Sequence, residues 1–433
     1  MKIFKTTSIL LIGLSGLFEK TNAQSAYQNI RIDIQENNFE YAPCEPSIAV
    51  DPTNTNNLVA GAILNRVYVS HDAGKTWSES GLESTHGVYG DPCVLANSKG
   101  DFYYLHLGDP EGKGWGSERL LESIVTQRSK DKGATWSNGS SAGANAPKDQ
   151  DKEWAIASPD SKRIYATWTQ FDKYESKVPT DSSNILFSAT NRKAKKWKKA
   201  VRINEIAGNC ADDDGTVEGA VPAVGPNGEV YVAWAVNENI YFDRSFDKGK
   251  TWMKHDIVAA DIPKGWSQDI PGIMRCNGMP ILVCDNSTGP NRGALYICWA
   301  DIRNGESDTD IWLVSSKDKG TTWTPPIKVN DDNPGRHQFF PWLAIDQANG
   351  QLHIVFYDRR NYTDDQTDVF LASSSDGGKT WINERISEKP FTPISHVFFG
   401  DYNNITAHNG IVRPIWTVYD DKKLSVWTAI INK

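Results

Sequence analysis

Short runs of alternating apolar and polar residues, separated by turns rich in Gly, Asn and Asp, follow one another along most of the chain. One such module holds an apolar run at 220–224, the turn 226–228, and two further runs at 229–235 and 240–243. A period of two over short, turn-bounded runs is typical of β-strands. No stretch shows a clear 3.6-residue period, so the pattern predicts an all-β chain built from repeated modules.

The motif Ser-x-Asp-x-Gly-x-Thr-Trp closes most of these modules. Intact copies begin at Ser70, Ser129, Ser245, Ser316 and Ser374, and a degenerate copy spans 188–197. From one copy to the next, the Asp position (Asn191 in the degenerate copy) advances by 59, 60, 56, 71 and 58 residues. An Asp followed two residues later by Gly suits a tight turn, because the carboxylate accepts backbone N–H groups and Gly takes a positive φ. We therefore interpret these aspartates as turn builders rather than acids or metal ligands.

The module count predicts the architecture. The innermost strands are expected to begin near Pro46, Pro92, Trp154, Val221, Met279, Phe340 and Tyr402. The last module supplies only three strands, and residues 30–34 provide a fourth from the other end of the chain. Pairing the two ends removes exposed strand edges. The prediction is a β-propeller of seven four-stranded blades, with six blades as the alternative, closed by an N-terminal strand.

The intact motif copies are similar to the Asp-box, or BNR, repeat of sialidases (neuraminidases) and related propellers. The resemblance extends over nearly all of the chain and is specific for the repeat, whereas a fold alone does not define an activity. Sialidases hold the substrate carboxylate with three arginines and use an Asp acid/base and a Tyr nucleophile activated by a Glu. The resemblance implies an exo-acting glycoside hydrolase that acts on acidic sugars of glycans.

Three residues match the positions of the sialidase catalytic groups. Tyr402 opens the last module, as the sialidase nucleophile does, and Glu218 precedes the inner strand of the fourth module, as the activating Glu does. Asp91, in Gly-Asp-Pro, is the candidate acid. A packing role for Tyr402 and a strand-capping role for Asp91 are the structural alternatives.

The substrate-binding candidates are Arg303 and Arg360, together with the adjacent Arg359. They lie in the aligned segments 301–304 and 358–361, each of which follows a second strand. Their side chains are expected either to converge above the central channel or to form local ion pairs with Asp301 and Asp358. The chain departs from the sialidase pattern because it lacks an early Arg-Ile-Pro motif and has seven predicted modules instead of six.

Two alternative functions come from other features. His86 and His106 are expected on the same face of the disc, where two neutral imidazoles beside Tyr89 or Tyr174 could abstract a proton from a uronic acid. That arrangement would make the protein a polysaccharide lyase. A non-catalytic propeller that binds a glycan or a protein through an aromatic face is the other alternative.

Composition limits partners and cofactors. The net charge is −8, which favours neither nucleic acid nor an anionic membrane as a partner. The basic stretch 192–199 is interpreted as a solvated edge. The six cysteines have no C-x-x-C spacing, so we expect no metal site and no cofactor. Their pairing as disulfides or burial as thiols is left open.

The first residues are typical of an export signal. Lys2 and Lys5 precede an apolar run at 8–18, and small residues at 21–23 offer a cleavage point. The apolar run is shorter than the roughly 20 residues that cross a bilayer. We therefore expect a signal peptide at 1–23, a single propeller domain at 24–433, no membrane span, and a secreted or periplasmic location.

Overall fold

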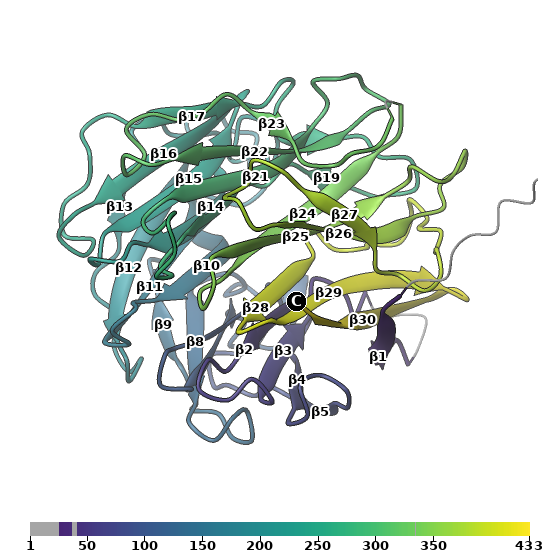
Figure 1. Cartoon of the computed structure of the whole chain (residues 1–433). Helices are drawn as coiled ribbons and strands as arrows, with labels where there is room; N and C mark the ends of the chain where they lie inside the picture. The colour runs from purple at the N-terminus through teal and green to yellow at the C-terminus, as the bar shows by residue number, and fades with distance from the viewer. Residues whose placement is uncertain (1–25, 37–40, 334) are drawn as a thin grey trace, which may run out of the picture.

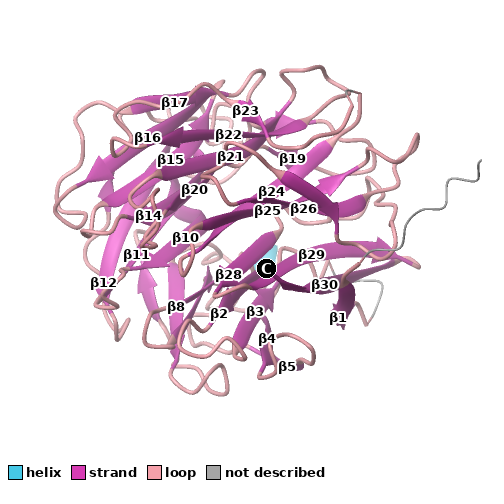
Figure 2. Cartoon of the chain, viewed as in Figure 1, coloured by secondary structure: helices cyan, strands magenta, loops and turns pink. Residues whose placement is uncertain are grey.

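The computed structural model describes residues 26–36, 41–333 and 335–433. Strands account for nearly all regular structure, and a single 3₁₀ turn at Gly114–Gly116 is the helical element within these ranges (Figures 1 and 2). No helix in the described part of the chain combines the length and apolar character needed to cross a bilayer. The predicted signal peptide at 1–23 lies outside the described residues.

Seven four-stranded antiparallel sheets surround a common centre, which confirms the predicted seven-bladed β-propeller.

Blade 1 consists of β2 (Ser47–Val50), β3 (Leu58–Ala62), β4 (Arg66–Ser70) and β5 (Ser78–Gly81). Blade 2 consists of β6 (Cys93–Ala96), β7 (Phe102–Leu107), β8 (Ile124–Ser129) and β9 (Ser140–Ala142). Blade 3 consists of β10 (Asp149–Ala157), β11 (Arg163–Phe171), β12 (Ser183–Asn191) and β13 (Val201–Arg202). Blade 4 consists of β14 (Glu218–Val224), β15 (Val230–Val236), β16 (Asn239–Ser245) and β17 (Ile257–Asp261). Blade 5 consists of β20 (Ile281–Cys284), β21 (Leu295–Asp301), β22 (Asp310–Ser316) and β23 (Ile327–Lys328). Blade 6 consists of β24 (Gln338–Asp346), β25 (Gln351–Asp358), β26 (Asp368–Ser374) and β27 (Ile382–Arg385).

Blade 7 joins the two ends of the chain, as predicted. It contains β28 (Asn404–His408), β29 (Ile411–Asp420) and β30 (Lys423–Asn432), and β1 (Gln28–Ile34) pairs antiparallel with β30. The pairing runs from Gln28 opposite Ile430 to Ile34 opposite Ser425. Each end of the chain thereby covers the strand edge that the other would expose.

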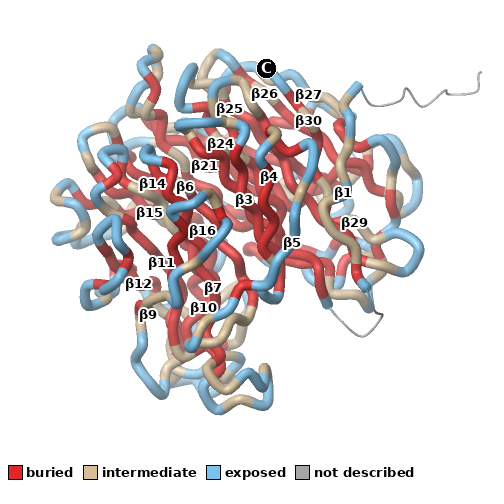
Figure 3. Tube along the Cα trace, turned by 90° about the horizontal axis from the view of Figure 1, so that it is seen from below, coloured by how far each residue is buried: buried red, intermediate tan, exposed pale blue. Residues whose placement is uncertain are grey.

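Buried side chains concentrate on the inner strands, and exposure rises toward the rim (Figure 3). Trp168, Trp234, Trp299 and Trp416 are each at most 1% exposed and occupy the second strands of blades 3, 4, 5 and 7. Large indoles at this position fill the space between neighbouring blades. All six cysteines are buried thiols without a disulfide partner, so the reduced alternative holds.

The Asp boxes form the turns expected of them. The first Ser of every intact box is the last residue of the third strand of its blade. In the first box, one carboxylate oxygen of Asp72 accepts N–H bonds from Lys75 at 3.0 Å and Thr76 at 2.9 Å, and the other accepts the Thr76 hydroxyl at 2.7 Å. These bonds occupy the carboxylate and leave it no catalytic role.

The box glycines also pack against the preceding blade. A Cβ built on Gly320 of blade 5 would lie 2.2 Å from a ring atom of Phe242 in blade 4. A Cβ on Gly133 of blade 2 would lie 2.7 Å from Val69 in blade 1. The motif therefore needs Gly for the close approach of two blades as well as for its positive φ.

The antiparallel order of the strands gives the disc two distinct faces. The starts of the first strands and the loops between second and third strands share one face, which we call the mouth face. The Asp-box turns, between third and fourth strands, share the opposite face, which we call the box face.

Candidate active site

A left-handed backbone conformation occurs just before, or within the first residues of, several inner strands on the mouth face. Glu45, Asp91, Lys152 and Phe340 have φ values of 53°, 48°, 55° and 50°. A left-handed conformation costs a non-glycine residue about 1–2 kcal/mol, and such strain gathers at functional sites. In blades 1, 2 and 3 this conformation presents charged side chains to one shared cavity.

An ion cluster built on the buried carboxylate of Asp401 lies on the mouth face, with Lys152 buried and Arg275 partly exposed. The carboxylate of Asp401 accepts hydrogen bonds from Arg275 Nε at 2.7 Å and Nη2 at 2.5 Å, and also binds the ammonium of Lys152. Burial alone would raise the pKa of Asp401, but Arg275 and Lys152 outweigh it and hold that pKa well below its usual value. Both cations therefore bind Asp401, and Arg275 also donates to Asp212 at 3.4 Å.

Arg275 comes from a hairpin that interrupts the regular blade pattern. Strands β18 (Ser267–Gln268) and β19 (Cys276–Asn277) form a separate two-stranded sheet between blades 4 and 5. The same insertion accounts for the 71-residue step between successive Asp boxes, the longest in the chain. It brings a guanidinium to the mouth that none of the seven blades supplies.

Asp91 and Asp151 line a cavity of about 310 Å³ beside this cluster. Their residues are 8% and 5% exposed, and their carboxyl groups make no hydrogen bond or ion pair with the rest of the described chain. Burial first, and the charge of Asp91 second, raise the pKa of Asp151 well above its usual value. Two unpartnered carboxyl groups, one of them favouring its protonated form, thus face the same space.

Exposed aromatic and apolar side chains form the rim of this cavity, which we call the aromatic cavity. Trp115 is 71% exposed and stacks on Tyr174 with ring centroids 5.8 Å apart. Tyr89 meets Trp115 edge-on at 6.3 Å, and Tyr41 and Met274 are also exposed at the rim. Clustered apolar exposure around a concave site is characteristic of ligand binding.

A second cavity of about 560 Å³ adjoins the first and shares Lys152, Met274 and Arg275 with it. We call it the acidic cavity. Glu218 lines it, is fully buried, and has no hydrogen-bond partner among the described residues for either carboxyl oxygen. Burial, followed by the charge of Asp212, raises the pKa of Glu218 well above its usual value. Asp212 itself accepts the Tyr174 hydroxyl at 2.8 Å.

Tyr402 lies in an aromatic cluster rather than beside Glu218. Its ring is 5.0 Å from that of Trp154 and 6.0 Å from that of Trp342, centroid to centroid. Its hydroxyl, like the Glu218 carboxyl, has no hydrogen-bond partner in the described structure, so the two do not bond to each other. Burial, then the charges of Asp91 and Glu45, raise the pKa of Tyr402 well above its usual value, which keeps it a phenol.

Arg303 and Arg360 form local ion pairs. Arg303 donates to Asp301 from Nη2 at 2.6 Å and from Nε at 2.9 Å, and its guanidinium lies over the Trp312 ring at 4.6 Å. Arg360 binds Asp358 at 2.8 Å and Asp331 at 2.5 Å. Neither residue lines the aromatic or the acidic cavity. The structure thus has the local ion pairs stated as the alternative for these arginines, because neighbouring aspartates bind their guanidinium groups.

Arg359 and the two histidines also lie outside both cavities. Arg359 is 2% exposed and donates to the Thr367 hydroxyl at 3.0 Å. His106 is fully buried, with Nδ1 at 2.8 Å from the Leu107 carbonyl oxygen and Nε2 at 3.1 Å from Gln127 Oε1. Burial lowers its pKa to about 4. His86 is partly exposed in the loop before β6. Both ring nitrogens of His106 already have hydrogen-bond partners, so His106 has no free nitrogen to accept a proton in lyase chemistry.

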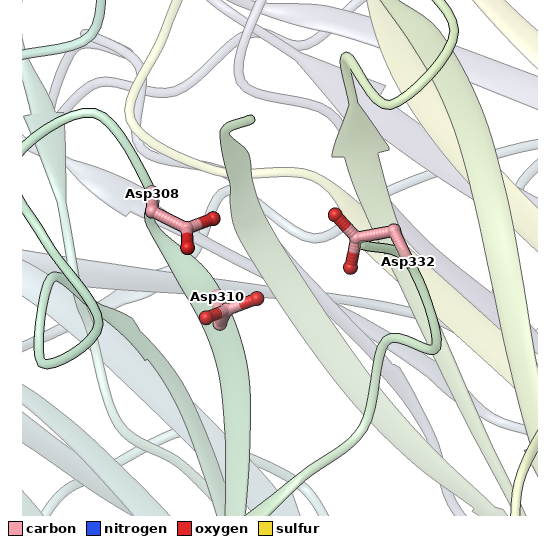
Figure 4. A group of neighbouring side chains, drawn as sticks. All are labelled: Asp308, Asp310 and Asp332. Carbon is pink, nitrogen blue, oxygen red and sulfur yellow. The ribbon is translucent and has the colours of Figure 1, made fainter. Parts of the chain in front are cut away.

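A separate cluster of three aspartates lies near the boundary of blades 5 and 6, outside both cavities. Asp308, Asp310 and Asp332 turn their carboxylates toward one another (Figure 4). The Lys328 ammonium lies 3.2 Å from Asp310 and 3.3 Å from Asp332, and Asn330 donates to both aspartates at 2.6 Å. The protein itself supplies the positive charge and hydrogen-bond donors here, so we assign this group a structural role.

Asp151, Lys152 and Arg275 were not predicted from the sequence. Asp151, Lys152 and Glu153 directly precede Trp154, where an inner strand was predicted, and these three consecutive charges were the available signal. The signal for Arg275 was the long fourth step of the repeat, of 71 residues. Of the residues predicted from the sialidase resemblance, Asp91 reaches the aromatic cavity and Glu218 the acidic cavity.

The comparison with known families identifies the repeat. A family model described as the BNR/Asp-box repeat matches residues 68–79, which include the first box. None of the curated proteins matches the sequence.

Solved structures share the fold at low sequence identity. A protein of unknown function from Dyadobacter fermentans aligns over 78% of this chain and 95% of its own, with 14% identity and a TM-score of 0.50. The Hadza microbial sialidase Hz136 aligns over 88% and 74%, with 14% identity and a TM-score of 0.51. The NanB sialidase from Streptococcus pneumoniae aligns over 87% and 83%, with 9% identity and a TM-score of 0.51. The chain is thus similar to sialidases in carrying an Asp-box repeat and a propeller, and its chemistry must be argued from its own mouth face.

Proposed function

We propose that the protein is an exported glycoside hydrolase whose active site is the aromatic cavity. The observation that carries this proposal is the pair of unpartnered carboxyl groups, Asp91 and Asp151, facing one space beneath exposed aromatic rings. Most glycoside hydrolases use two carboxyl groups whose environments separate their pKa values, so that one donates a proton and the other stays a base or nucleophile. Export rests on the predicted signal peptide at 1–23.

The roles follow from the surroundings of each group. Asp151, with its raised pKa, donates a proton to the glycosidic oxygen, and Asp91 acts on the anomeric carbon either directly or through water. The sugar ring lies against the rim formed by Trp115 and Tyr174. Lys152 and Arg275, bound to Asp401, hold the strained inner-strand starts in position.

The charge of the mouth favours neutral or amino sugars over acidic ones. Acidic residues lining the two cavities outnumber basic residues by ten to three. All three basic residues are already paired, Lys152 and Arg275 with Asp401 and Lys264 with Glu306. A sugar carboxylate would therefore find repulsion and no free guanidinium, unlike the acidic substrate that the sialidase resemblance implies.

Hydrolysis of a panel of neutral, amino and acidic oligosaccharides by the purified protein tests the proposal. We expect cleavage of a neutral or amino substrate and a loss of about 100-fold or more in kcat/KM for Asp151→Asn and Asp91→Asn. Asp421→Asn, an exposed turn residue, should retain the parent rate. Asn suits the positive φ at Asp91, so that variant should fold normally.

The same panel can contradict the proposal. Cleavage of a fluorogenic sialoside that Tyr402→Phe abolishes, while Asp151→Asn retains it, would establish the sialidase nucleophile instead. Equal activity of both Asp variants and the parent would remove the carboxyl pair from the chemistry.

A glycan-binding propeller without catalysis is the second candidate. Two observations favour it: the aromatic rim, and the pairing of Arg303 and Arg360 with neighbouring aspartates. Its distinguishing result would be measurable binding of an oligosaccharide with no product formed. Trp115→Ala should then weaken binding, while Asp151→Asn should leave it nearly unchanged.

A further inference from the structure

A basic groove lies between blades 2 and 3, away from both cavities of the mouth. Its volume is about 900 Å³, and five of its nine lining residues are basic whereas none is acidic. The basic residues are Arg128, Lys130, Arg192, Lys193 and Lys195. Such a concentration of positive charge is notable in a chain whose net charge is −8.

Most of this charge is not neutralised by the protein. Arg128 and Arg192 share one buried carboxylate, Asp101, at 2.7 and 2.9 Å. Lys130, Lys193 and Lys195 are exposed, and their ammonium groups form no ion pair with any residue that the structure describes. The groove therefore keeps an excess of about four positive charges for a ligand.

The degenerate Asp box produces the groove. In this copy Asn191 replaces the Asp, and two extra residues lengthen the turn, which then carries Arg192, Lys193 and Lys195. The Ser140 hydroxyl of blade 2 donates to the carbonyl of Ala194 at 2.7 Å and fixes this turn against the neighbouring blade. The lysines are exposed, as expected of a solvated edge, and they belong to a turn that this hydrogen bond anchors.

The groove lies on the box face. Lys130 directly follows β8 and Arg192 directly follows β12, at the ends of the third strands of their blades. The aromatic cavity opens on the mouth face, so the two sites are on opposite sides of the disc.

We propose that the basic groove binds an anionic polysaccharide that carries sulfate or carboxylate groups. Arginine forks and lysine ammonium groups are the usual partners of these anions, and a polyanion gains affinity by releasing counterions when it binds several such groups. The site is independent of the proposed catalysis, because it shares no residue with either mouth cavity.

Binding of heparin and dextran sulfate to the full chain, with neutral dextran as the uncharged probe, tests this proposal. The triple variant Lys130→Ala/Lys193→Ala/Lys195→Ala should lose about tenfold or more in affinity, and the slope of log K against log salt concentration should fall by about two to three. Binding to neutral dextran should be absent for both proteins.

The matched control is Lys75→Ala/Lys250→Ala/Lys379→Ala. These lysines are exposed, lie in Asp boxes of blades 1, 4 and 6 on the same face, and remove the same total charge. The control should keep the parent affinity within about twofold, since long-range charge effects are screened beyond roughly 10 Å. Circular dichroism and the unfolding temperature would show that both triple variants fold.

Three results would overturn the proposal: no binding of either sulfated polymer, equal weakening by both triple variants, or tighter binding of duplex DNA than of the sulfated polymers. The last would identify a nucleic acid as the ligand. Loss of glycoside hydrolysis in Asp151→Asn with heparin binding unchanged would separate the groove from the active site.

Discussion

Two buried carboxyl groups on the mouth face have no hydrogen-bond partner among the residues that the structure describes, which is costly for a folded protein. Glu218 and Glu153 have no hydrogen-bond partner in the described chain for any of their carboxyl oxygens, and both are at most 1% exposed. A carboxyl group in this setting stays protonated in the folded protein at a pH where it ionises in the unfolded chain. Such groups reduce the stability of the folded protein at neutral pH.

Glu218→Gln should raise the unfolding temperature near pH 8, and the gain should shrink toward zero near pH 4. The pKa of Glu218 lies well above its usual 4.5, so the parent protein loses stability as the pH rises from about 4.5 through the raised value. A Gln side chain has no proton to lose. Calorimetry across this pH range measures the difference, and a gain that does not vary with pH would contradict the assignment.

Glu229→Gln provides a control of opposite sign. Burial alone would raise the pKa of Glu229, but its hydrogen bond to Lys319 and others lower the value overall. Its ionised form therefore stabilises the fold above its ordinary pKa, and this contribution is lost as the pH falls. The substitution should lower the unfolding temperature near pH 8 and have less effect near pH 3.

Among the individual residues of the site, only some could be recognised from the sequence. Asp91 and Glu218 are recognisable because they directly precede or begin inner strands, where a propeller gathers its functional groups. Arg275 could not be placed, since it reaches Asp401 across 126 residues of sequence from a hairpin outside the repeat. The Tyr402–Glu218 contact expected from the sialidase resemblance is absent because aromatic packing holds Tyr402 elsewhere.

The element that organises the fold is the Asp box, and its glycine joins neighbouring blades. Gly320→Ala should destabilise the protein by about 2–5 kcal/mol, combining the strain of positive φ with overpacking against Phe242. Chemical denaturation measures this loss.

Gly112→Ala measures the loss of stability that comes from backbone strain alone. Gly112 also has a positive φ, of 65°, but a Cβ there would meet nothing within 4 Å. We expect a loss of about 1–2 kcal/mol from strain alone. Equal losses at both positions would show that the contact between blades contributes nothing.

The sequence predicted these elements well because each box ends a third strand. Six boxes, counting the degenerate one, set the spacing of the blades, and the turn residues between the apolar runs set the strands. The function of the degenerate box was missed, since the loss of its Asp was visible in the sequence but the groove beside it depends on contact with blade 2.

For the molecule as a whole, the pairing of β1 with β30 closes the ring. Removal of residues 26–35 should lower the unfolding temperature and increase hydrogen exchange in blades 7 and 1, because β30 loses one of its two partner strands and Ile32 leaves the apolar cluster of Ile48 and Val426. Exchange in blades 3 to 5 should change little. Uniform loss of protection around the ring would instead indicate that the blades unfold as one unit.

The closure of the ring also determines what a shortened chain would expose. A chain interrupted before Lys423 would lack β30, leaving β1 without a partner and blade 7 with two strands. Exposed strand edges and poorly covered apolar surface attract proteases and chaperones. Copies that end before β30 should therefore be digested more readily than chains that include it, because only the latter can pair β1 with β30.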